Sequence, residues 1–324
     1  MSNQKGTHLA ELIWEASLII WDEAPGLTVQ AFWREYCSFR GDFRQTLPVI
    51  TKAGREQTVD GSLTRSLLWS SFKLLKLSRN MRITYSVADE ARFMHGYTFP
   101  EWVLALGDGK LKTTSFKPDT PSDWVQIPQI FLVDHGTHPI GSITEGIYDM
   151  FLHNYRQPQY LATRAIITPK NTTVTEINSY MLQQVPDITK TYYSSDSLQN
   201  HTQIMLLRNL SPGLGLCNGT WIMITSLGDN VIQGTIMGGS NDSDDFPVRL
   251  CYGMTINKSQ GQTLDKVGIY LPDPVFSHGQ LYVGVSRVRS ANGLRILIDN
   301  PADIPGDYTR NIVFREAFTD ILQA

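Results

Sequence analysis

The sequence has no long apolar run and no excess of positive charge, and each absence excludes a class of protein. No stretch approaches the roughly 20 consecutive apolar residues that a membrane-spanning helix needs, so we expect no membrane partner. The formal net charge is −3 and the isoelectric point is near 6.2, so the overall basic character typical of nucleic-acid-binding domains is missing. Any contact with a nucleic acid must therefore depend on local groups.

Cysteine is also scarce, which excludes a disulfide scaffold. The sequence holds 3 cysteines, Cys37, Cys217 and Cys251, and their odd number and scattered positions indicate reduced, structural thiols in an intracellular protein. A hydrophobic fraction of 41% over 324 residues is typical of a folded chain rather than a disordered one. A chain of this length can hold about two domains, each with its own core.

Two segments in the last quarter of the chain carry most of the chemical information. The first, MTINKSQGQTLD at residues 254–265, is rich in small polar groups that can approach a phosphate, and Gly261 adds no side-chain bulk there. The second, GQLYVGVSRVR at residues 279–289, predicts a β-like run over 281–285 that ends near Arg287. A guanidinium at the end of such an element suits a planar, charge-delocalised contact with a phosphate.

These segments resemble the second RecA-like domain of superfamily-one DNA helicases, and most closely the petite-integration-frequency (PIF) type carried by Helitron transposons. The resemblance implies an α/β fold with two RecA-like (P-loop NTPase) domains, the first incomplete, and a small SH3-like β insertion in the second. An ordinary β-meander without a DNA role is the alternative for that insertion. The resemblance also implies DNA contacts by Thr255, Asn257, Lys258, Ser259 and Gln260. Taken alone, Lys258 would be a solvated surface lysine.

A motif near the N-terminus fits the same family. The apolar run at residues 18–21 predicts a buried parallel strand that delivers Asp22 and Glu23 at its carboxyl end. The resemblance makes Asp22 the Mg²⁺ ligand and Glu23 the group that activates the attacking water. The alternative is that the two carboxylates cap a following helix.

Two further motifs follow in the order that the family has. GDFRQ at residues 41–45 resembles the helicase motif whose glutamine senses the γ-phosphate, and LSRNMR at 77–82 resembles the motif that supplies an arginine finger. Arg287 would be a second finger. The resemblance thus implies Asp22, Glu23, Gln45, Arg82 and Arg287 as catalytic residues, and nucleotide contacts by Gln45, Arg82, Gly261, Gln280 and Arg287.

The activity that the resemblance implies is an ATP-dependent DNA helicase with ATP and Mg²⁺ as cofactors. Such an enzyme moves 5′ to 3′ along single-stranded or forked DNA and serves repair, recombination or transposon replication. A nuclear location would follow only if the host is a eukaryote that carries such transposons, because the sequence shows no clear basic targeting run.

One motif of this family is missing, the loop G-x-x-x-x-G-K-[ST] that cradles the β- and γ-phosphates. The nearest candidate, LGDGKL at residues 106–111, has Leu111 where a serine or threonine must stand, and a solvated turn is the better interpretation. We therefore expect a chain truncated at its N-terminus that hydrolyses no ATP alone, with a partner chain as a possible source of the loop. The alternatives are a non-catalytic DNA-binding remnant, or a degenerate transposon relic or incomplete gene model.

Two shortened regions also separate this chain from the family pattern. Residues 31–40 read as an amphipathic helix where a buried strand should precede the motif at 41–45, which would leave Gln45 away from the nucleotide. Residues 234–247 are polar and acidic where the family has longer β structure.

The remaining patterns predict the order of domains and elements. We expect a strand at 164–168 followed by a helix at 171–182, β runs with hairpin turns over 203–238, and strands at 248–250, 267–271 and 294–298. The predicted organisation is a truncated first RecA-like domain with a connecting helix (1–112), a linker rich in proline and serine (113–128), the first part of the second RecA-like domain (129–200), the SH3-like insertion (201–245), the last two motifs of the second domain (246–300) and a C-terminal tail (301–324).

Overall fold

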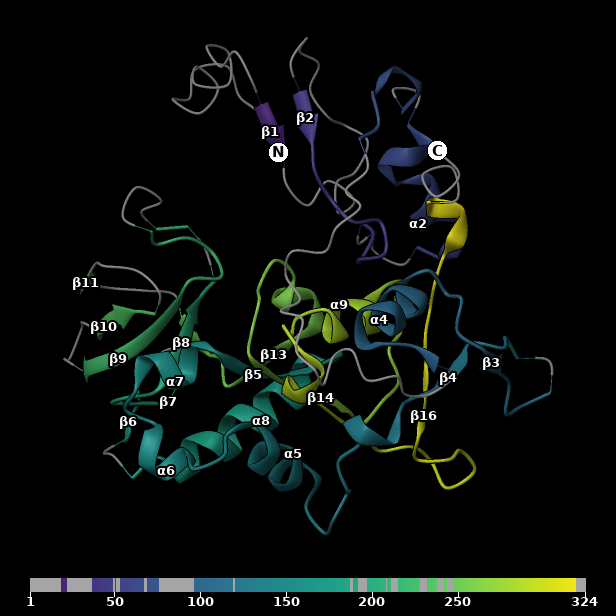
Figure 1. Ribbon diagram of the computed structural model, residues 1–324. Coiled ribbons are helices and arrows are strands. Elements are labelled where there is room, and N and C mark those ends of the chain that lie inside the picture. The colour runs from purple at the N-terminus through teal and green to yellow at the C-terminus, as the bar shows by residue number, and fades with distance from the viewer. Residues whose placement is uncertain are drawn as a thin grey trace. The chain divides into compact units, whose positions relative to one another are not determined.

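Figure 1 shows the computed structural model of the chain. Contacts within the chain divide it into unit 1, Met1–Ser78 with Val313–Ala324, and unit 2, Arg79–Ile312. This division differs from the expected boundary at residues 113–128. The structure describes residues 19–21, 37–48, 50, 53–66, 69–75, 96–118, 120–186, 189–191, 197–207, 209–210, 215–227, 232–237, 242–243 and 248–318.

A four-stranded parallel sheet is the centre of unit 2. Its order is β13 (Gly253–Thr255), β5 (Arg164–Thr168), β14 (Lys266–Leu271) and β15 (Leu294–Ile298). These strands are short aliphatic runs that are buried on both faces, which is the pattern of a parallel sheet covered by helices. Thr255 pairs with Thr168, so the carboxyl ends of β13 and β5 lie side by side. The predicted α/β class and the strands predicted at 164–168 and 294–298 are confirmed.

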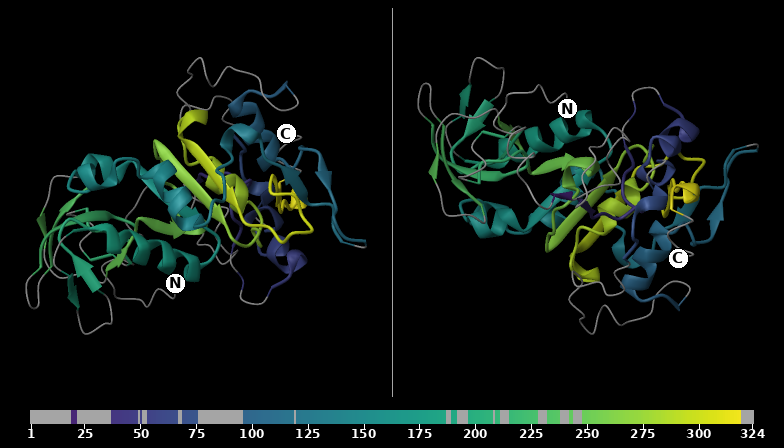
Figure 2. Two further views of the ribbon diagram at one scale, coloured as in Figure 1. Left: turned by 90° about the horizontal axis from the view of Figure 1, so that it is seen from below. Right: turned by 90° about the horizontal axis from the view of Figure 1, so that it is seen from above.

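Helices cover both faces of this sheet (Figures 1 and 2). On one face, α5 (Pro139–Ile147) and α8 (Asn171–Gln184) pack their aliphatic side chains against Ile166 and Tyr270 of the sheet. On the other face, α4 (Phe99–Gly107) and α9 (Gln280–Val285) pack against a second core that holds the alternate strand residues. Two short helices, α6 (Phe151–Asn154) and α7 (Pro158–Ala162), precede β5.

A five-stranded antiparallel sheet is inserted between α8 and β13. Its order is β11 (Asp242–Ser243), β10 (Ile232–Ile236), β9 (Trp221–Leu227), β8 (Gln203–Leu206) and β12 (Val248–Leu250). Its own core contains Ile204, Ile222, Ile224 and Ile232, so it buries an apolar face without help from the parallel sheet. The hairpin strands predicted over residues 203–238 are confirmed. A separate hairpin, β6 (Thr189–Thr191) with β7 (Ser197–Gln199), precedes it.

A buried asparagine fixes the point where this inserted sheet returns to the parallel one. The side-chain nitrogen of Asn178, on α8, donates to the carbonyl oxygens of Leu250 at 2.9 Å and Gly253 at 3.1 Å. Its side-chain oxygen accepts from the backbone nitrogen of Gly253 at 2.8 Å. Asn178 is 4% exposed, so these bonds are shielded from water. The junction between β12 and β13 is therefore held by α8.

The segment expected as a linker, residues 113–128, forms part of unit 2 instead. It contains β3 (Thr113–Thr114) and β4 (Trp124–Gln126), which build an antiparallel sheet with β16 (Tyr308–Arg310). Val125 is fully buried at the centre of β4. Its prolines lie in the connections between strands, which is why a composition rich in proline and serine gave the wrong prediction.

Unit 1 contains a small parallel pair, β1 (Ile19–Trp21) with β2 (Cys37–Phe39). The helix predicted over residues 31–40 is therefore wrong at Cys37–Phe39, where β pairing overrides a helical charge pattern. The motif at 41–45 follows β2 directly. The remaining short elements are α2 (Arg55–Asp60), η2 (Leu63–Arg65), η3 (Trp69–Ser71) and η9 (Arg315–Ala317); unit 2 adds η5 (Gln129–Phe131), η7 (Ile256–Ser259) and η8 (Ala291–Gly293).

The core of unit 1 joins residues from both ends of the chain. Leu47 and Val59 pack with Ala317 and Phe318, which are each at most 4% exposed. The C-terminal segment therefore belongs to unit 1 rather than forming an independent tail. Among the described residues, no helix combines the length and the apolar character needed to cross a membrane.

Candidate functional site

The segment predicted to bind DNA is a short 3-10 turn at the carboxyl edge of the parallel sheet. Thr255 ends β13, and η7 follows it directly. Asn257 and Lys258 are exposed, Thr255 and Gln260 are half-buried, and Ser259 is fully buried. The Ser259 hydroxyl donates to the carbonyl oxygen of Ile256 at 2.7 Å, so it closes the turn from inside. The turn thus presents an amide and an ammonium group outward.

Arg287 holds this turn from behind. Its side chain has no exposed surface, and its Nη1 donates to the carbonyl oxygens of Gln262 at 3.0 Å and Ser259 at 3.4 Å. Its Nε donates to the carbonyl of Val283 at 2.9 Å, and its Nη2 donates to the Ser286 hydroxyl at 2.8 Å. The predicted phosphate contact of this residue stays a prediction. In the structure, Nη1 of the guanidinium bonds to the backbone of the turn that is predicted to bind DNA.

Gln280 is a second link between α9 and the turn. It is 1% exposed, and its Nε2 donates to Oδ1 of Asn257 at 3.1 Å. Its Oε1 accepts from the backbone nitrogens of Phe276 at 3.0 Å and Ser277 at 3.2 Å. All of these partners are protein groups, and the predicted nucleotide contact of Gln280 stays a prediction. No sequence signal indicated either tether, because each joins residues more than 20 positions apart.

The β-like run predicted over residues 281–285 is wrong, because these residues form the helix α9. Its composition, with valines and a tyrosine, favours a strand by propensity. Every residue of Gln280–Val285 is buried, so the segment shows no polar face from which a helical period could be read. Gly279 begins the helix in the left-handed region, with φ of 71°.

Gly261 closes the turn in a conformation that other residues rarely adopt. Its φ is +81°, in the left-handed region that glycine enters without steric cost. Glycine at this position therefore provides both the lack of bulk expected from the sequence and a backbone conformation that the turn requires. Its predicted nucleotide contact is untested.

Charge along the carboxyl edge is uneven. Near β14, Lys170 pairs with Asp273 at 2.8 Å. Burial, and then the neighbouring carboxylates Asp299, Glu176 and Asp273, raise the pKa of Tyr270 to about 12. On the β14 and β15 side, the three carboxylates Glu176, Asp273 and Asp299 thus lie near Tyr270, with Lys170 and His135 as their partners, whereas the β13 side presents Lys258. A polyanion would meet less repulsion on the β13 side.

Of the residues predicted near the N-terminus, only Gln45 can be placed. It is 8% exposed in unit 1, and its backbone nitrogen donates to the carbonyl of Asp42 at 3.0 Å. Its side-chain Oε1 is buried without a hydrogen-bond partner in the described part of the chain, which costs about 1–3 kcal/mol. Asp22, Glu23 and Arg82 lie outside the described residues.

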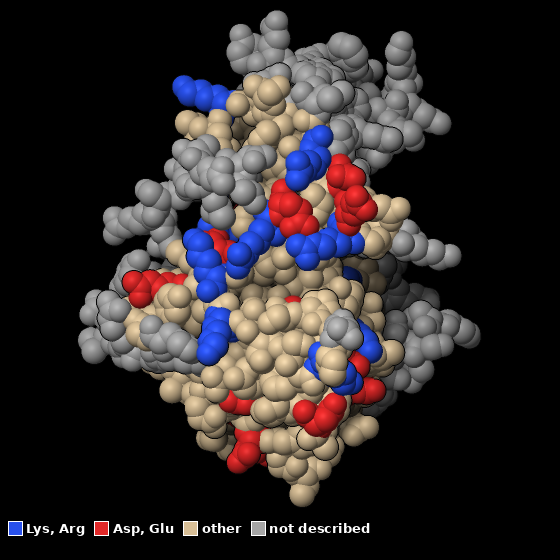
Figure 3. Space-filling view, turned by 90° about the vertical axis from the view of Figure 1, so that its right-hand side faces the viewer, with Lys and Arg blue, Asp and Glu red and all other residues tan. Residues whose placement is uncertain are grey.

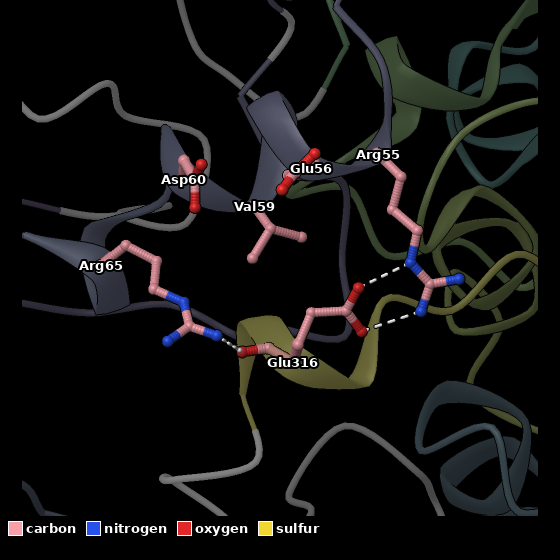
Figure 4. Close-up of a pocket in the computed structure, with 6 residues that line it drawn as sticks. All are labelled: Arg55, Glu56, Val59, Asp60, Arg65 and Glu316. Atoms are coloured by element: carbon pink, nitrogen blue, oxygen red, sulfur yellow. Dashed lines mark hydrogen bonds and ion pairs between the residues drawn. The ribbon is translucent and has the colours of Figure 1, made fainter.

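A hollow on unit 1 is occupied by paired charges rather than by a convergent site (Figure 4). The Arg55 guanidinium donates to both carboxylate oxygens of Glu316, at 2.6 and 2.8 Å. Arg65 donates to the Glu316 carbonyl at 3.3 Å, so both arginines attach the C-terminal segment to unit 1. On the face drawn in Figure 3, lysine and arginine side chains likewise lie interspersed with acidic ones. Within the described residues, no group of three or more His, Cys, Asp or Glu side chains could hold a metal ion.

Two family models match the sequence, a PIF1-like helicase model over residues 30–117 and the 2B domain of DNA helicase Pif1 over residues 197–227. The ATP-dependent DNA helicase PIF1 of Homo sapiens is 34% identical over 126 residues, which are 32% of this chain and 20% of that protein. The enzyme of the same name from Danio rerio is 28% identical over 206 residues, 50% of this chain and 32% of that protein. The chain thus spans a third or less of the length of these relatives.

Solved structures agree on the fold. Pif1 helicase from Bacteroides in complex with ADP-AlF3 and ssDNA covers 100% of this chain and 78% of its own, with a TM-score of 0.64 and 19% identity. Pif1 helicase from Candida albicans covers 94% and 76%, with a TM-score of 0.58 and 16% identity. At these identities the likeness shows the fold alone, which is the α/β architecture of RecA-like helicase domains. In its matched segments and in its fold, the chain is thus similar to PIF1-like helicases.

Proposed function

We propose that the chain is part of an ATP-dependent DNA helicase and binds single-stranded DNA at residues 255–262. The observation that carries this proposal is the turn itself, which presents Asn257 and Lys258 outward while Arg287 and Gln280 hold it from inside. The relatives named ATP-dependent DNA helicase PIF1, and the Bacteroides structure with bound ssDNA, support the choice of ligand. Movement from 5′ to 3′ is proposed by resemblance only.

The proposed DNA contacts follow from exposure and chemistry. The Lys258 ammonium would neutralise a phosphate, and the Thr255 hydroxyl with the Asn257 and Gln260 amides would hydrogen-bond to phosphate or sugar oxygens. Ser259 would act by closing the turn. Such contacts carry little sequence information, so we expect binding with weak base preference.

For the nucleotide, we propose the roles that the motifs imply. Asp22 would hold Mg²⁺, Glu23 would activate water, and Gln45, Arg82 and Arg287, with Gly261 and Gln280 nearby, would contact ATP. ATP hydrolysis would supply the free energy for movement along DNA. The buried orphan oxygen of Gln45 fits a residue of this kind. Because the Arg287 donors bond to loop carbonyls, a phosphate contact by this residue would exchange those bonds.

The 324 residues contain no glycine-rich phosphate loop, so we propose that the chain alone does not hydrolyse ATP. A partner chain would have to supply the phosphate cradle. The Helitron branch, an SH3-like class for the inserted sheet and a nuclear location in a eukaryotic host are further proposals that rest on the resemblance alone. A DNA-binding remnant without catalysis is the second candidate, favoured by that missing loop.

The test uses the whole chain with a labelled single-stranded oligonucleotide and an ATPase assay. We expect binding that weakens with salt and no DNA-stimulated hydrolysis above background. Robust hydrolysis that Glu23→Gln abolishes would overturn the proposed inactivity. A complete lack of DNA binding would overturn the proposed function.

A further inference from the structure

An exposed phenylalanine lies in the connection between β14 and α9. The Phe276 side chain is 60% exposed, whereas the preceding Val275 is 1% exposed and part of the main core of unit 2. His278, two positions further on, is fully buried. The ring therefore points out of a segment whose neighbours are anchored in the protein. An exposed ring forgoes about 1.5–3 kcal/mol of burial free energy, which a bound partner could recover.

The backbone beneath this ring is held in place. Gln280, which is itself buried, accepts hydrogen bonds from the backbone nitrogens of Phe276 and Ser277. Gly279 donates to the carbonyl of Ile312 at 3.0 Å, which fixes the other end of the turn. A ring displayed from a fixed backbone loses little conformational entropy when a flat ligand packs on it.

The same glutamine connects Phe276 to the proposed DNA-binding turn. Its Oε1 holds the Phe276 backbone, and its Nε2 holds the side chain of Asn257, the residue next to Lys258. One buried amide group thus links the backbone that carries the exposed ring to the turn that carries Lys258. A cation near an exposed aromatic ring suits a single strand, since phosphates meet the cation while bases stack on the ring.

We propose that Phe276 is a stacking platform for a base of single-stranded DNA whose backbone crosses the turn at 255–260. This rests on the proposed function, because the turn defines where the strand runs. Two equally exposed apolar side chains, Met150 and Leu152, have a different setting. Met150 and Leu152 lie beside Asp149, whose carboxylate pairs with the first residues of β5 and β14, at the amino edge of the sheet.

The test compares the affinity of the whole chain for an oligothymidine with that of Phe276→Ala, Phe276→Leu and Phe276→Trp. Stacking contributes a factor of about 5 to 150 in affinity, which both Phe276→Ala and Phe276→Leu should lose. Phe276→Trp should keep or improve binding. Leu152→Ala, which removes an equally exposed side chain at the other edge, should leave affinity unchanged. Thermal unfolding of each variant checks its folding.

A second ligand separates stacking from a structural effect. An abasic oligonucleotide of the same length keeps the phosphates but removes the bases, so it should bind the wild type and Phe276→Ala equally. Equal loss by Phe276→Ala on both ligands, or no loss on either, would overturn the stacking role. If Lys258→Ala weakens binding while the Phe276 variants do not, only this inference fails. If no variant or wild type binds DNA, the proposed function fails with it.

Discussion

The Nη1 atom of Arg287 donates to the carbonyl oxygen of Gln262 at 3.0 Å, from a side chain with no exposed surface. Along the chain, the strand β14 and the helix α9 lie between these two residues. Their contact joins the candidate DNA-binding turn to the end of α9. The shape of that turn therefore depends on Arg287, the residue for which the resemblance implies a contact with the nucleotide.

Replacing Arg287 should destabilise the turn and weaken DNA binding. Arg287→Ala removes a charged donor from the carbonyls of Ser259 and Gln262, and the loss of such bonds costs about 1.5–3 kcal/mol each. We expect a fall of about 3 kcal/mol in the free energy of unfolding by denaturant titration. Amides within 258–264 should also exchange faster with deuterium.

Two controls make the Arg287 experiment specific. Arg287→Lys keeps the charge but not the planar fork, so it should restore only part of the loss. Arg289→Ala removes an arginine that is 55% exposed and only 3.6 Å from Asp265, and should cost less than about 1 kcal/mol. Unchanged exchange rates in Arg287→Ala would show that the turn keeps its shape without this side chain.

Asn178 should be the main support for the return of the inserted sheet. Asn178→Ala leaves the buried carbonyls of Leu250 and Gly253 and the Gly253 nitrogen without their partner. Each unsatisfied buried group costs about 1–3 kcal/mol, so we expect a loss of about 3 kcal/mol, measured by thermal or urea unfolding. The exposed Asn292→Ala is the matched control. Equal stability of the two variants would contradict this role.

A side chain at Gly261 should strain the turn. Gly261→Ala places a Cβ on a residue with φ of +81°, a conformation that costs an ordinary L-residue about 1–2 kcal/mol. The turn relieves this strain by changing shape, so DNA affinity should fall together with stability. Gly261→Asn should cost less, because asparagine tolerates the left-handed region better. Comparable affinity of all three proteins would mean that binding does not depend on this conformation.

Asp149 gives a pH dependence with a definite sign. A hydrogen bond from Lys266, with the charges of Lys266 and Arg164, lowers the pKa of the Asp149 carboxyl below the ordinary 3.8. Its folded pKa is therefore below its unfolded one, so its stabilisation is complete above pH 3.8 and is lost as the pH falls through the lowered value. The carboxylate is 53% exposed, so Asp149→Asn should cost less than about 1 kcal/mol at pH 7. Unfolding curves of the two proteins should converge in acid; a gap that widens instead would contradict the assignment.

The sequence predicted the parallel strands well and the surrounding elements less well. The runs at Arg164–Thr168 and Leu294–Ile298 are short and aliphatic, with turn residues on both sides, so their bounds were evident. The same rule failed for α9, whose uniformly buried residues carry no period. It also failed for β4, a short strand between prolines in which Val125 is buried in the core.

For the candidate site, the sequence indicated the polar turn but not what holds it. The family resemblance indicated Asn257 and Lys258 as DNA contacts, and the structure places both on the surface. The tethers of Gln280 and Arg287 depend on how α9 packs behind η7, and packing over such separations cannot be read from local patterns. The sequence did not indicate Phe276, because what distinguishes this residue is its exposure, which the sequence alone does not give.

The most direct test of the DNA-binding turn is the salt dependence of single-stranded DNA affinity for the whole chain, Lys258→Ala and Lys117→Ala. Lys117, 64% exposed on the β3–β4 connection, controls for the loss of one positive charge. We predict that Lys258→Ala weakens binding and reduces the slope of log affinity against log salt by about one, while Lys117→Ala matches the wild type. An affinity and slope of Lys258→Ala equal to those of the wild type would contradict a DNA-binding site at this turn.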